Sequence, residues 1–317
     1  MRKESTSSTR GFAAAVVLLI VLLLIPIANN AAQAEPSGDN APSSIILGDR
    51  GGLTPEPSVM VPTQEGTTPS IEVGARAGFA TDYIYRGVTL SDHKPAVGAG
   101  IEAVLGPLYA GTTFTSVKLP NEHTVELTAA TGVRPKLWNI DWDFGWTYFA
   151  YPGGSPLGPG INYWEVGGRA DTKLTEWLHL AAGFAYSPNF SNTGAWSKYA
   201  ASGLGADLPS AVLPQGVAGT VTAGVGYYWF GNQSAALGGF ALPAYFNWNA
   251  GITFKRKIFS LDLRYYDTNL SKENCFVFTG DPNATPGGQA NPLTNPEGLT
   301  SGWCSATFVA KFGFELD

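Results

Sequence analysis

Residues 140–148 read Ile-Asp-Trp-Asp-Phe-Gly-Trp-Thr-Tyr, and this stretch decides the fold class. Large apolar side chains occupy every second position, and acidic, small or hydroxyl-bearing residues fill the positions between them. Successive side chains of a β-strand point to opposite faces, so the stretch predicts a strand with one apolar and one polar face. Residues 259–266 and 308–316 repeat this alternation. The chain from Ile71 onward is therefore expected to be β-structure.

The same alternation predicts about twelve strands along the chain. Most are about ten residues long, which is the length that a tilted strand needs to cross a bilayer. The expected ranges are 71–86, 95–105, 108–118, 123–134, 138–150, 162–172, 177–187, 197–206, 217–229, 245–255, 259–268 and 306–316.

The connections between these strands alternate in length. Those at 106–107, 135–137, 173–176 and 256–258 are tight, whereas those at 87–94, 152–161, 188–196, 230–244 and 269–305 are long. The segments 207–216 and 119–122 depart from the pattern. An even number of strands joined by alternating short turns and long loops is typical of an outer-membrane β-barrel, with the short turns on the periplasmic side. The fold class is thus expected to be all-β, a transmembrane antiparallel up-and-down barrel.

The composition excludes several classes of protein. Only 14% of the residues are charged and the mean hydropathy is +0.01, which is too little charge for an ordinary soluble surface and too little hydrophobicity for several membrane helices. The net charge of -6 argues against a nucleic-acid partner. A soluble sandwich or lipocalin-like barrel would also alternate, but its outer face needs charge, and the sequence has none from Leu208 to Phe254.

The N-terminal part of the chain differs from the rest. Residues 1–34 have the basic start, the apolar core and the Ala32-Gln33-Ala34 site of an export signal, with an uncleaved anchor as the alternative. Residues 35–70 are rich in proline and poor in aromatic residues, which predicts a disordered acidic linker. Residues 71–317 are expected to form the barrel, placed in the bacterial outer membrane.

Charged residues on the polar faces of the predicted strands define the candidate lining of the barrel. Nine acids face four bases, and this excess predicts a narrow channel with a weak preference for cations. The alternative is a closed polar core in which each base bridges two acids. The candidate lining residues are Glu72, Arg76, Glu102, Glu126, Asp141, Asp143, Glu165, Arg169, Asp171, Asp262, Arg264, Lys311 and Glu315.

Aromatic residues gather near the predicted strand ends, where they are expected to form the two girdles of a membrane barrel. The alternative is that tyrosine and tryptophan simply favour strands. The residues concerned are Trp138, Tyr151, Tyr163, Trp177, Tyr186, Trp196, Tyr228, Trp229, Tyr245 and Tyr266.

Two further features lie in loops. Cys275 and Cys304 fall in the longest loop, and export to an oxidising compartment predicts a disulfide between them. That loop would then form a lid over the barrel mouth or only resist proteases. Ser91, Asp92 and His93 place a hydroxyl, a carboxylate and an imidazole side by side, which leaves an outer-membrane hydrolase as a minor alternative.

The segment that contains Ser91, Asp92 and His93 also carries a family resemblance. Residues 81–97 read Thr-Asp-Tyr-Ile-Tyr-Arg-Gly-Val-Thr-Leu-Ser-Asp-His-Lys-Pro-Ala-Val, and together with later landmarks such as Tyr151-Pro152-Gly153 they resemble the TorF-like family of bacterial porins. The resemblance covers most of residues 71–317 and implies an outer-membrane barrel. The chain departs from such barrels by ending in Asp317 rather than an aromatic residue. The motif residues are Asp82, Tyr83, Tyr85, Arg86, Gly87, Ser91 and Pro95.

These observations together predict a porin-like passive channel for small hydrophilic solutes rather than an enzyme. Diffusion down a gradient needs no cofactor and no metal. The expected partners are outer-membrane lipids, the barrel assembly machinery and the solutes themselves. A structural or adhesive barrel that does not conduct is the main alternative.

Overall fold

The computed structural model describes residues 70–154, 160–284 and 298–316. The expected signal (1–34) and almost all of the expected linker (35–70) lie outside these residues. The long strands are β1 (Ile71–Ala80), β4 (Ala96–Leu105), β5 (Leu108–Ser116), β6 (Val125–Val133), β8 (Ile140–Ala150), β9 (Tyr163–Lys173), β10 (Leu178–Ser187), β11 (Ser197–Asp207), β12 (Ala218–Phe230), β13 (Tyr245–Arg256), β14 (Phe259–Thr268) and β15 (Thr307–Leu316).

Shorter elements lie in the connections. Two-residue strands are β2 (Ile84–Tyr85), β3 (Val88–Thr89) and β7 (Lys136–Leu137), and α2 spans Lys272–Thr279. Single 3-10 turns are η2 (Pro120–Glu122), η3 (Phe190–Asn192), η4 (Ser210–Val212), η5 (Ala235–Leu237) and η6 (Pro282–Ala284). In the described part of the chain, no helix has the length and apolar character needed to cross a membrane.

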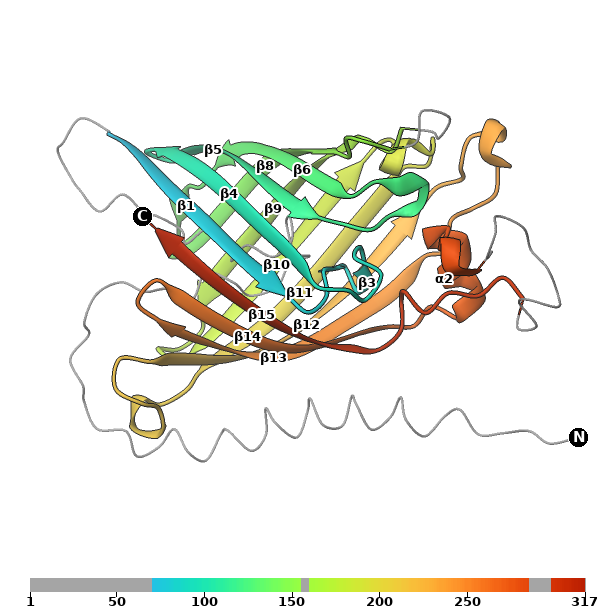
Figure 1. Ribbon diagram of the computed structural model, residues 1–317. Helices are drawn as coiled ribbons and strands as arrows, with labels where there is room; N and C mark the ends of the chain where they lie inside the picture. The colour runs from blue at the N-terminus through green and yellow to red at the C-terminus, as the bar shows by residue number, and fades with distance from the viewer. Residues whose placement is uncertain (1–69, 155–159, 285–297, 317) are drawn as a thin grey trace, which may run out of the picture.

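The twelve long strands form a closed antiparallel barrel, which confirms the predicted fold class. Each long strand pairs with its neighbour in sequence, β1 closes the ring by pairing with β15, and β6 pairs with β8. The strands tilt across the barrel axis, and β1 lies beside β15 (Figure 1). Closure pairs the first long strand with the last, so no long strand is left as an open edge of the sheet.

The two ends of the barrel differ. We call the end with the short connections, such as 106–107 and 257–258, the turn end, and the opposite end the loop end. The C-terminus lies at the turn end, and the hairpin of β2 and β3 lies at the loop end together with α2 (Figure 1). Along each long strand, inward side chains alternate with outward ones, as the period of two predicts.

One strand differs from its predicted range by more than two residues. The first strand was expected to run to residue 86, but β1 ends at Ala80 and the chain turns into the barrel. Tyr83 and Tyr85 are 0% and 8% exposed, although they continue the alternation of β1. Alternation shows that a segment is extended, but it does not show which strand it pairs with.

Candidate functional site in the barrel lumen

Residues 81–95, which we call the lumen hairpin, fold into the loop end of the barrel. β2 pairs with β3 through Ile84 opposite Thr89 and Tyr85 opposite Val88. The two residues between them, Arg86 and Gly87, have φ angles of 49° and 86°, as two-residue hairpin turns with a twist matching the strands require. A Cβ atom on Gly87 would also lie 2.6 Å from a methyl carbon of Thr268, so only glycine fits there.

An ion pair fastens the tip of the lumen hairpin to the barrel wall. Arg86 donates from Nη1 to Oε1 of Glu165 at 3.0 Å and from Nη2 to Oε2 at 2.7 Å. The side chains of the two residues are only 5% and 7% exposed. Burial alone would lower the pKa of Arg86, but the carboxylate of Glu165 raises it well above its ordinary value. Arg86 therefore stays charged, and the two-pronged geometry satisfies the guanidinium and the carboxylate together.

Tyrosine rings enclose this ion pair. The guanidinium carbon of Arg86 lies 4.7, 4.4 and 4.5 Å from the ring centroids of Tyr85, Tyr199 and Tyr228. The hydroxyls of Tyr85 and Tyr228 also donate to Glu165, each at 3.3 Å. Desolvated cation–π contacts of this kind each stabilise the cation by about 2 kcal/mol. The tip is thus held by charge, by hydrogen bonds and by ring faces.

A second carboxylate holds the base of the lumen hairpin. Glu126, on β6, is 1% exposed and accepts hydrogen bonds from the hydroxyls of Tyr83 and Tyr151, both at 2.7 Å. Burial raises the pKa of Tyr151 well above its ordinary value, and the carboxylate of Glu126 raises it further. The Tyr151 hydroxyl therefore stays protonated and able to donate.

Asp82 organises the interior of the hairpin itself. Its carboxylate accepts hydrogen bonds from the hydroxyls of Thr89 at 2.5 Å and Ser91 at 2.9 Å, and contacts Nδ1 of His93 at 2.7 Å. The other ring nitrogen of His93 lies 3.1 Å from the carbonyl oxygen of Gly302. Ser91 and His93 both bind Asp82 rather than each other, so Ser91, Asp92 and His93, the basis of the minor hydrolase alternative, are not assembled as a triad.

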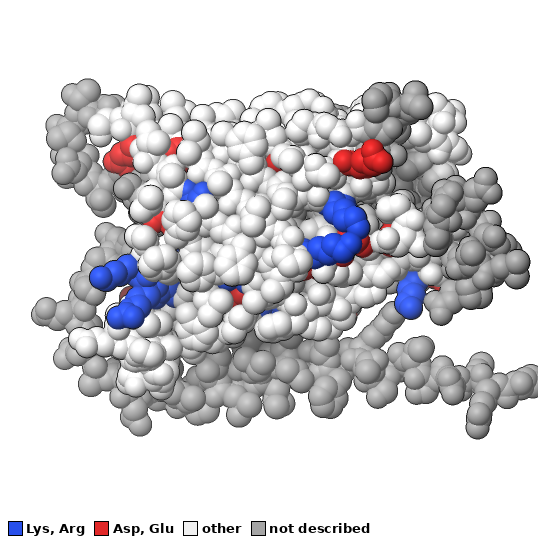
Figure 2. Space-filling view, in the orientation of Figure 1, with Lys and Arg blue, Asp and Glu red and all other residues white. Residues whose placement is uncertain are grey.

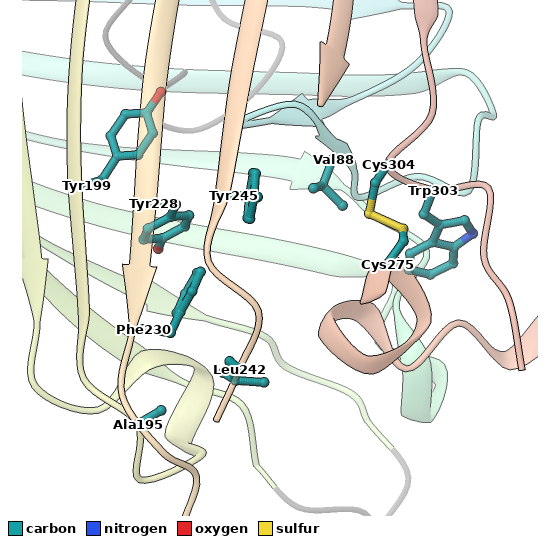
Figure 3. Close-up of a cluster of buried hydrophobic side chains, with 10 residues drawn as sticks. All are labelled: Val88, Ala195, Tyr199, Tyr228, Phe230, Leu242, Tyr245, Cys275, Trp303 and Cys304. Carbon is teal, nitrogen blue, oxygen red and sulfur yellow. A yellow bond between two sulfur atoms is a disulfide. The ribbon is translucent and has the colours of Figure 1, made fainter. Parts of the chain in front are cut away.

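The disulfide predicted between Cys275 and Cys304 is present, with an S–S distance of 2.01 Å. Both cysteines are buried and pack in one cluster with Val88 of the lumen hairpin and with Tyr228 and Tyr245 of the wall (Figure 3). The loop that contains the disulfide therefore covers the hairpin from outside the barrel.

Several charged side chains toward the turn end form ion pairs. Arg134 donates to both carboxylate oxygens of Glu102, at 2.7 and 2.9 Å, and to Asp143 at 3.4 Å. The ring of Tyr109 lies 3.8 Å from its guanidinium carbon. Burial alone would lower the pKa of Arg134, but the hydrogen bonds to Glu102 raise it. A cation from a turn thus neutralises two of the nine carboxylates in the predicted lining.

The other predicted lining residues occupy inward positions of their strands. Arg169 pairs with Asp171 at 2.5 Å, and Arg264 pairs with Asp262 at 2.6 Å. Lys136, in the short strand β7, lies 3.4 Å from Asp141. The remaining members lie on β1 and β15, where Glu72 is exposed, Arg76 stands opposite Glu315, and Lys311 stands opposite Asp262 on β14.

The charge balance of the lumen differs from the one that the sequence indicated. Three bases, Arg86, Arg134 and Lys136, lie outside the strand positions that were counted, yet they contact four of the nine acids. The count of nine acids to four bases therefore overstates the net negative charge around these four acids. A count restricted to strands could not find them, because each reaches the lumen from a hairpin or a turn.

The aromatic girdle prediction is half wrong. Trp138, Tyr186, Trp196 and Trp229 are 85%, 37%, 38% and 42% exposed on the outside, as expected. Five of the other residues are buried inside the barrel at the loop end: Tyr151, Tyr163, Tyr228, Tyr245 and Tyr266. The sequence held the signal that separates the two groups, since Tyr163 stands two positions before Glu165 and so shares its inward face.

The remaining motif residue, Pro95, is exposed where the hairpin leaves the lumen. Within the described residues, no cluster of three or more His, Cys, Asp and Glu side chains could hold a metal ion. The arrangement is that of a polar barrel interior filled at one end by a segment of its own chain.

A profile of the family described as "Bacterial protein of unknown function (Gcw_chp)" matches residues 63–287. The chain belongs to this family. The description does not include the TorF-like label, which therefore stays unconfirmed. No curated protein matches this Gcw_chp sequence.

Solved structures with a similar fold include outer-membrane porins and channels. The KdgM porin in complex with disordered oligogalacturonate has a TM-score of 0.43 and 6% identity, over 78% of this chain and 99% of that one. The NanC porin has a TM-score of 0.43 and 8% identity, over 78% of this chain and 100% of that one. An outer-membrane channel from Pseudomonas putida F1 has a TM-score of 0.37 and 12% identity, over 80% and 98%. At these scores the function has to be argued from the residues of this chain.

Proposed function

We propose that this Gcw_chp protein is a porin-like passive channel for small hydrophilic solutes in the bacterial outer membrane, narrowed at its loop end by the lumen hairpin. The observation that supports this proposal best is the contrast between an apolar outside and a polar, partly accessible inside at the turn end. Export through a signal at residues 1–34 and insertion by the barrel assembly machinery belong to the same proposal.

The outer surface supports a lipid environment. Among the outward positions of the long strands, charged side chains occur only near strand ends, at Lys198, Arg256 and Asp267. The larger charged clusters visible on one face lie toward its two ends (Figure 2). Charge is costly on the lipid face at bilayer depth, and its absence there is typical of membrane barrels. Exposed apolar side chains on this surface include Phe79, Ile101, Phe114, Phe184, Val225, Phe308 and Phe312.

The inner surface supports passage of polar solutes from the turn end. Asp143, Arg169, Asp171 and Asp262 line this half of the lumen and are only partly buried. These side chains form ion pairs, so a solute meets little net charge in this half of the lumen. We therefore expect the cation preference of the channel to be weak.

Planar-bilayer recording tests this proposal. Purified, heat-modifiable protein is expected to give single-channel conductance and a reversal potential shifted slightly toward the cation in a salt gradient. Asp171→Asn together with Asp262→Asn removes one negative charge beside each of Arg169 and Arg264, so the reversal potential is expected to move toward the anion. Glu176→Gln, in an exposed turn, is the matched control and is expected to leave it unchanged.

A second candidate function is a structural or adhesive barrel that does not conduct. The buried ion pair of Arg86 and Glu165, which holds the lumen hairpin inside the loop end, favours it. Folded protein that gives no conductance in any of these recordings would refute the channel and support this alternative.

A further inference from the structure

The lumen hairpin is held from two sides, and the outer side is the disulfide loop, by which we mean the described residues 269–284 and 298–306. Four contacts join the two segments directly. The amide of Thr89 donates to the carbonyl oxygen of Trp303 at 3.0 Å, and Nε1 of Trp303 donates to Asp92 at 3.0 Å. Asn283 also donates to Asp92, at 2.9 Å, and His93 contacts the carbonyl of Gly302.

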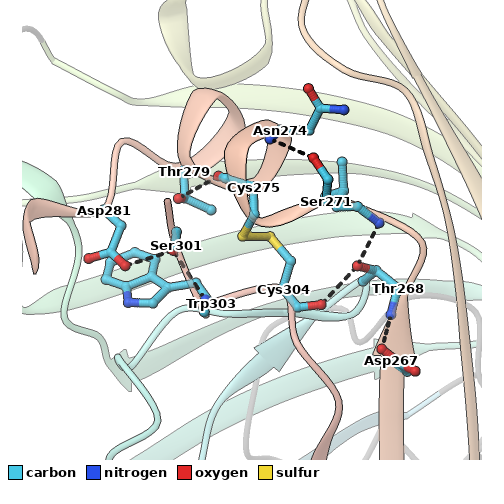
Figure 4. The surroundings of a disulfide bond; sticks show 12 residues. Asp267, Thr268, Ser271, Asn274, Cys275, Thr279, Asp281, Ser301, Trp303 and Cys304 are labelled. Carbon is cyan, nitrogen blue, oxygen red and sulfur yellow. Dashed lines mark hydrogen bonds between the residues drawn. A yellow bond between two sulfur atoms is a disulfide. The ribbon is translucent and has the colours of Figure 1, made fainter. Parts of the chain in front are cut away.

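The disulfide keeps these contacts in position. Trp303 adjoins Cys304, and Cys304 is bound to Cys275 in α2 (Figure 4). The carbonyl oxygen of Cys304 accepts a hydrogen bond from Thr268 at the end of β14, at 2.8 Å. An eight-residue helix such as α2 is not stable by itself in water. The disulfide therefore joins the segment that carries Trp303 to α2. It also holds α2 itself in place.

The same disulfide reaches the ion pair in the lumen through continuous packing. Cys275 and Cys304 pack in one buried cluster with Val88, which follows the Arg86-Gly87 turn. That cluster includes Tyr228 (Figure 3). Tyr228 also contacts both Arg86 and Glu165. Release of the outer contacts would uncover Val88 and expose the Arg86 ion pair to water, where such a pair contributes little.

We infer that the Cys275–Cys304 disulfide is the clamp that keeps the lumen hairpin inside the barrel, and that its reduction by a dithiol releases the hairpin and widens the channel. The clamp follows from these contacts, and the widening of the channel rests on the proposed function. In the reaction, the dithiol loses two electrons and two protons to become a cyclic disulfide. The protein S–S bond takes them up and becomes two thiols.

Hydrogen exchange followed by mass spectrometry tests the clamp without any need for conduction. The probe is dithiothreitol, added to the full-length protein in lipid vesicles, with free thiols counted to show that reduction is complete. The amide of Thr89 reports the contact with Trp303. The amides of Tyr83, bonded to Ser91, and Leu90, bonded to Tyr83, report the hairpin itself. Reduction is expected to speed exchange at all three by roughly a hundredfold or more, while strand amides stay protected.

A Cys275→Ser, Cys304→Ser double variant keeps the inference testable if the buried disulfide resists dithiothreitol. It is expected to show the same rapid exchange in residues 81–95 and a larger single-channel conductance without reductant. Glu273→Gln, an exposed change in the same helix that leaves the disulfide intact, is the matched control and is expected to behave as the parent protein.

The outcomes separate the clamp from the channel. Unchanged exchange at Tyr83 and Leu90 in the reduced protein and in the double serine variant would overturn the clamp, whatever the conductance. Equal release in the Glu273→Gln variant would also overturn it, because the disulfide would then not be the element that matters. Rapid exchange without any conductance would support the clamp and refute the proposed channel.

Discussion

The buried ion pair of Arg86 and Glu165 allows a quantitative test of how the lumen hairpin is held. Arg86→Met removes the cation and leaves Glu165 buried beside Tyr85 and Tyr228, and Glu165→Leu leaves Arg86 buried beneath the same rings. The double variant replaces both charged side chains with apolar ones. The three variants form a thermodynamic cycle in which each single change strands one charge and the double change strands none.

The magnitude follows from the surroundings. Removing one member of a buried pair costs about 3–5 kcal/mol. We expect the lower end, about 3 kcal/mol, because Glu165 keeps two tyrosine donors and Arg86 keeps three ring faces. Because 1.4 kcal/mol corresponds to a factor of ten, each single variant should open the hairpin about a hundredfold more often. The double variant should lie within about 1 kcal/mol of the parent protein, since apolar replacement of a buried pair is often neutral.

Hydrogen exchange at the amides of Tyr83 and Leu90 measures this opening directly, with exchange in the wall strands as the internal reference. Lys136→Met is the matched control, because its pair with Asp141 spans 3.4 Å and the lysine side chain is 55% exposed. Removing that pair should change opening by less than about 1 kcal/mol. A double variant as strongly perturbed as the sum of the two single variants would refute the reasoning, because the charges would then not act as a pair.

Three further predictions concern other contacts of the lumen. Tyr83→Phe removes one donor from buried Glu126, so the hairpin should lose about 1–3 kcal/mol of protection by hydrogen exchange, and a loss below that range would contradict the assigned bond. The hydrogen bond to Asp82 raises the pKa of His93, so its contribution to hairpin docking should be complete below about pH 6.5 and fade as the pH rises through the raised value. His93→Gln should abolish that pH dependence. If the dependence persists in this variant, another titrating group causes it. Arg134→Met should shift the reversal potential toward the cation, whereas an unchanged potential would place this residue outside the conducting path.

The barrel itself could be predicted from local sequence. The alternation in residues 140–148 and 259–266 depends only on side chains pointing to opposite faces of a strand, which is a property of a few consecutive residues. The alternating short and long connections then predicted the strand order, because strands joined by a short turn pair antiparallel with each other. The inward parity of Glu126, Glu165 and Asp262 followed from the same rule. Such features require no knowledge of distant contacts.

The candidate site could not be predicted in this way, because its partners meet only in the folded barrel. Tyr83 and Tyr85 alternate as if β1 continued, and local sequence does not distinguish a longer strand from a segment that turns into the lumen. Arg86 and Glu165 are 79 positions apart in the sequence. They meet because β9 passes the lumen hairpin at the loop end of the barrel. Because closure of the sheet sets the diameter of the lumen, only the tertiary structure decided which side chains fill it and which cations neutralise its acids.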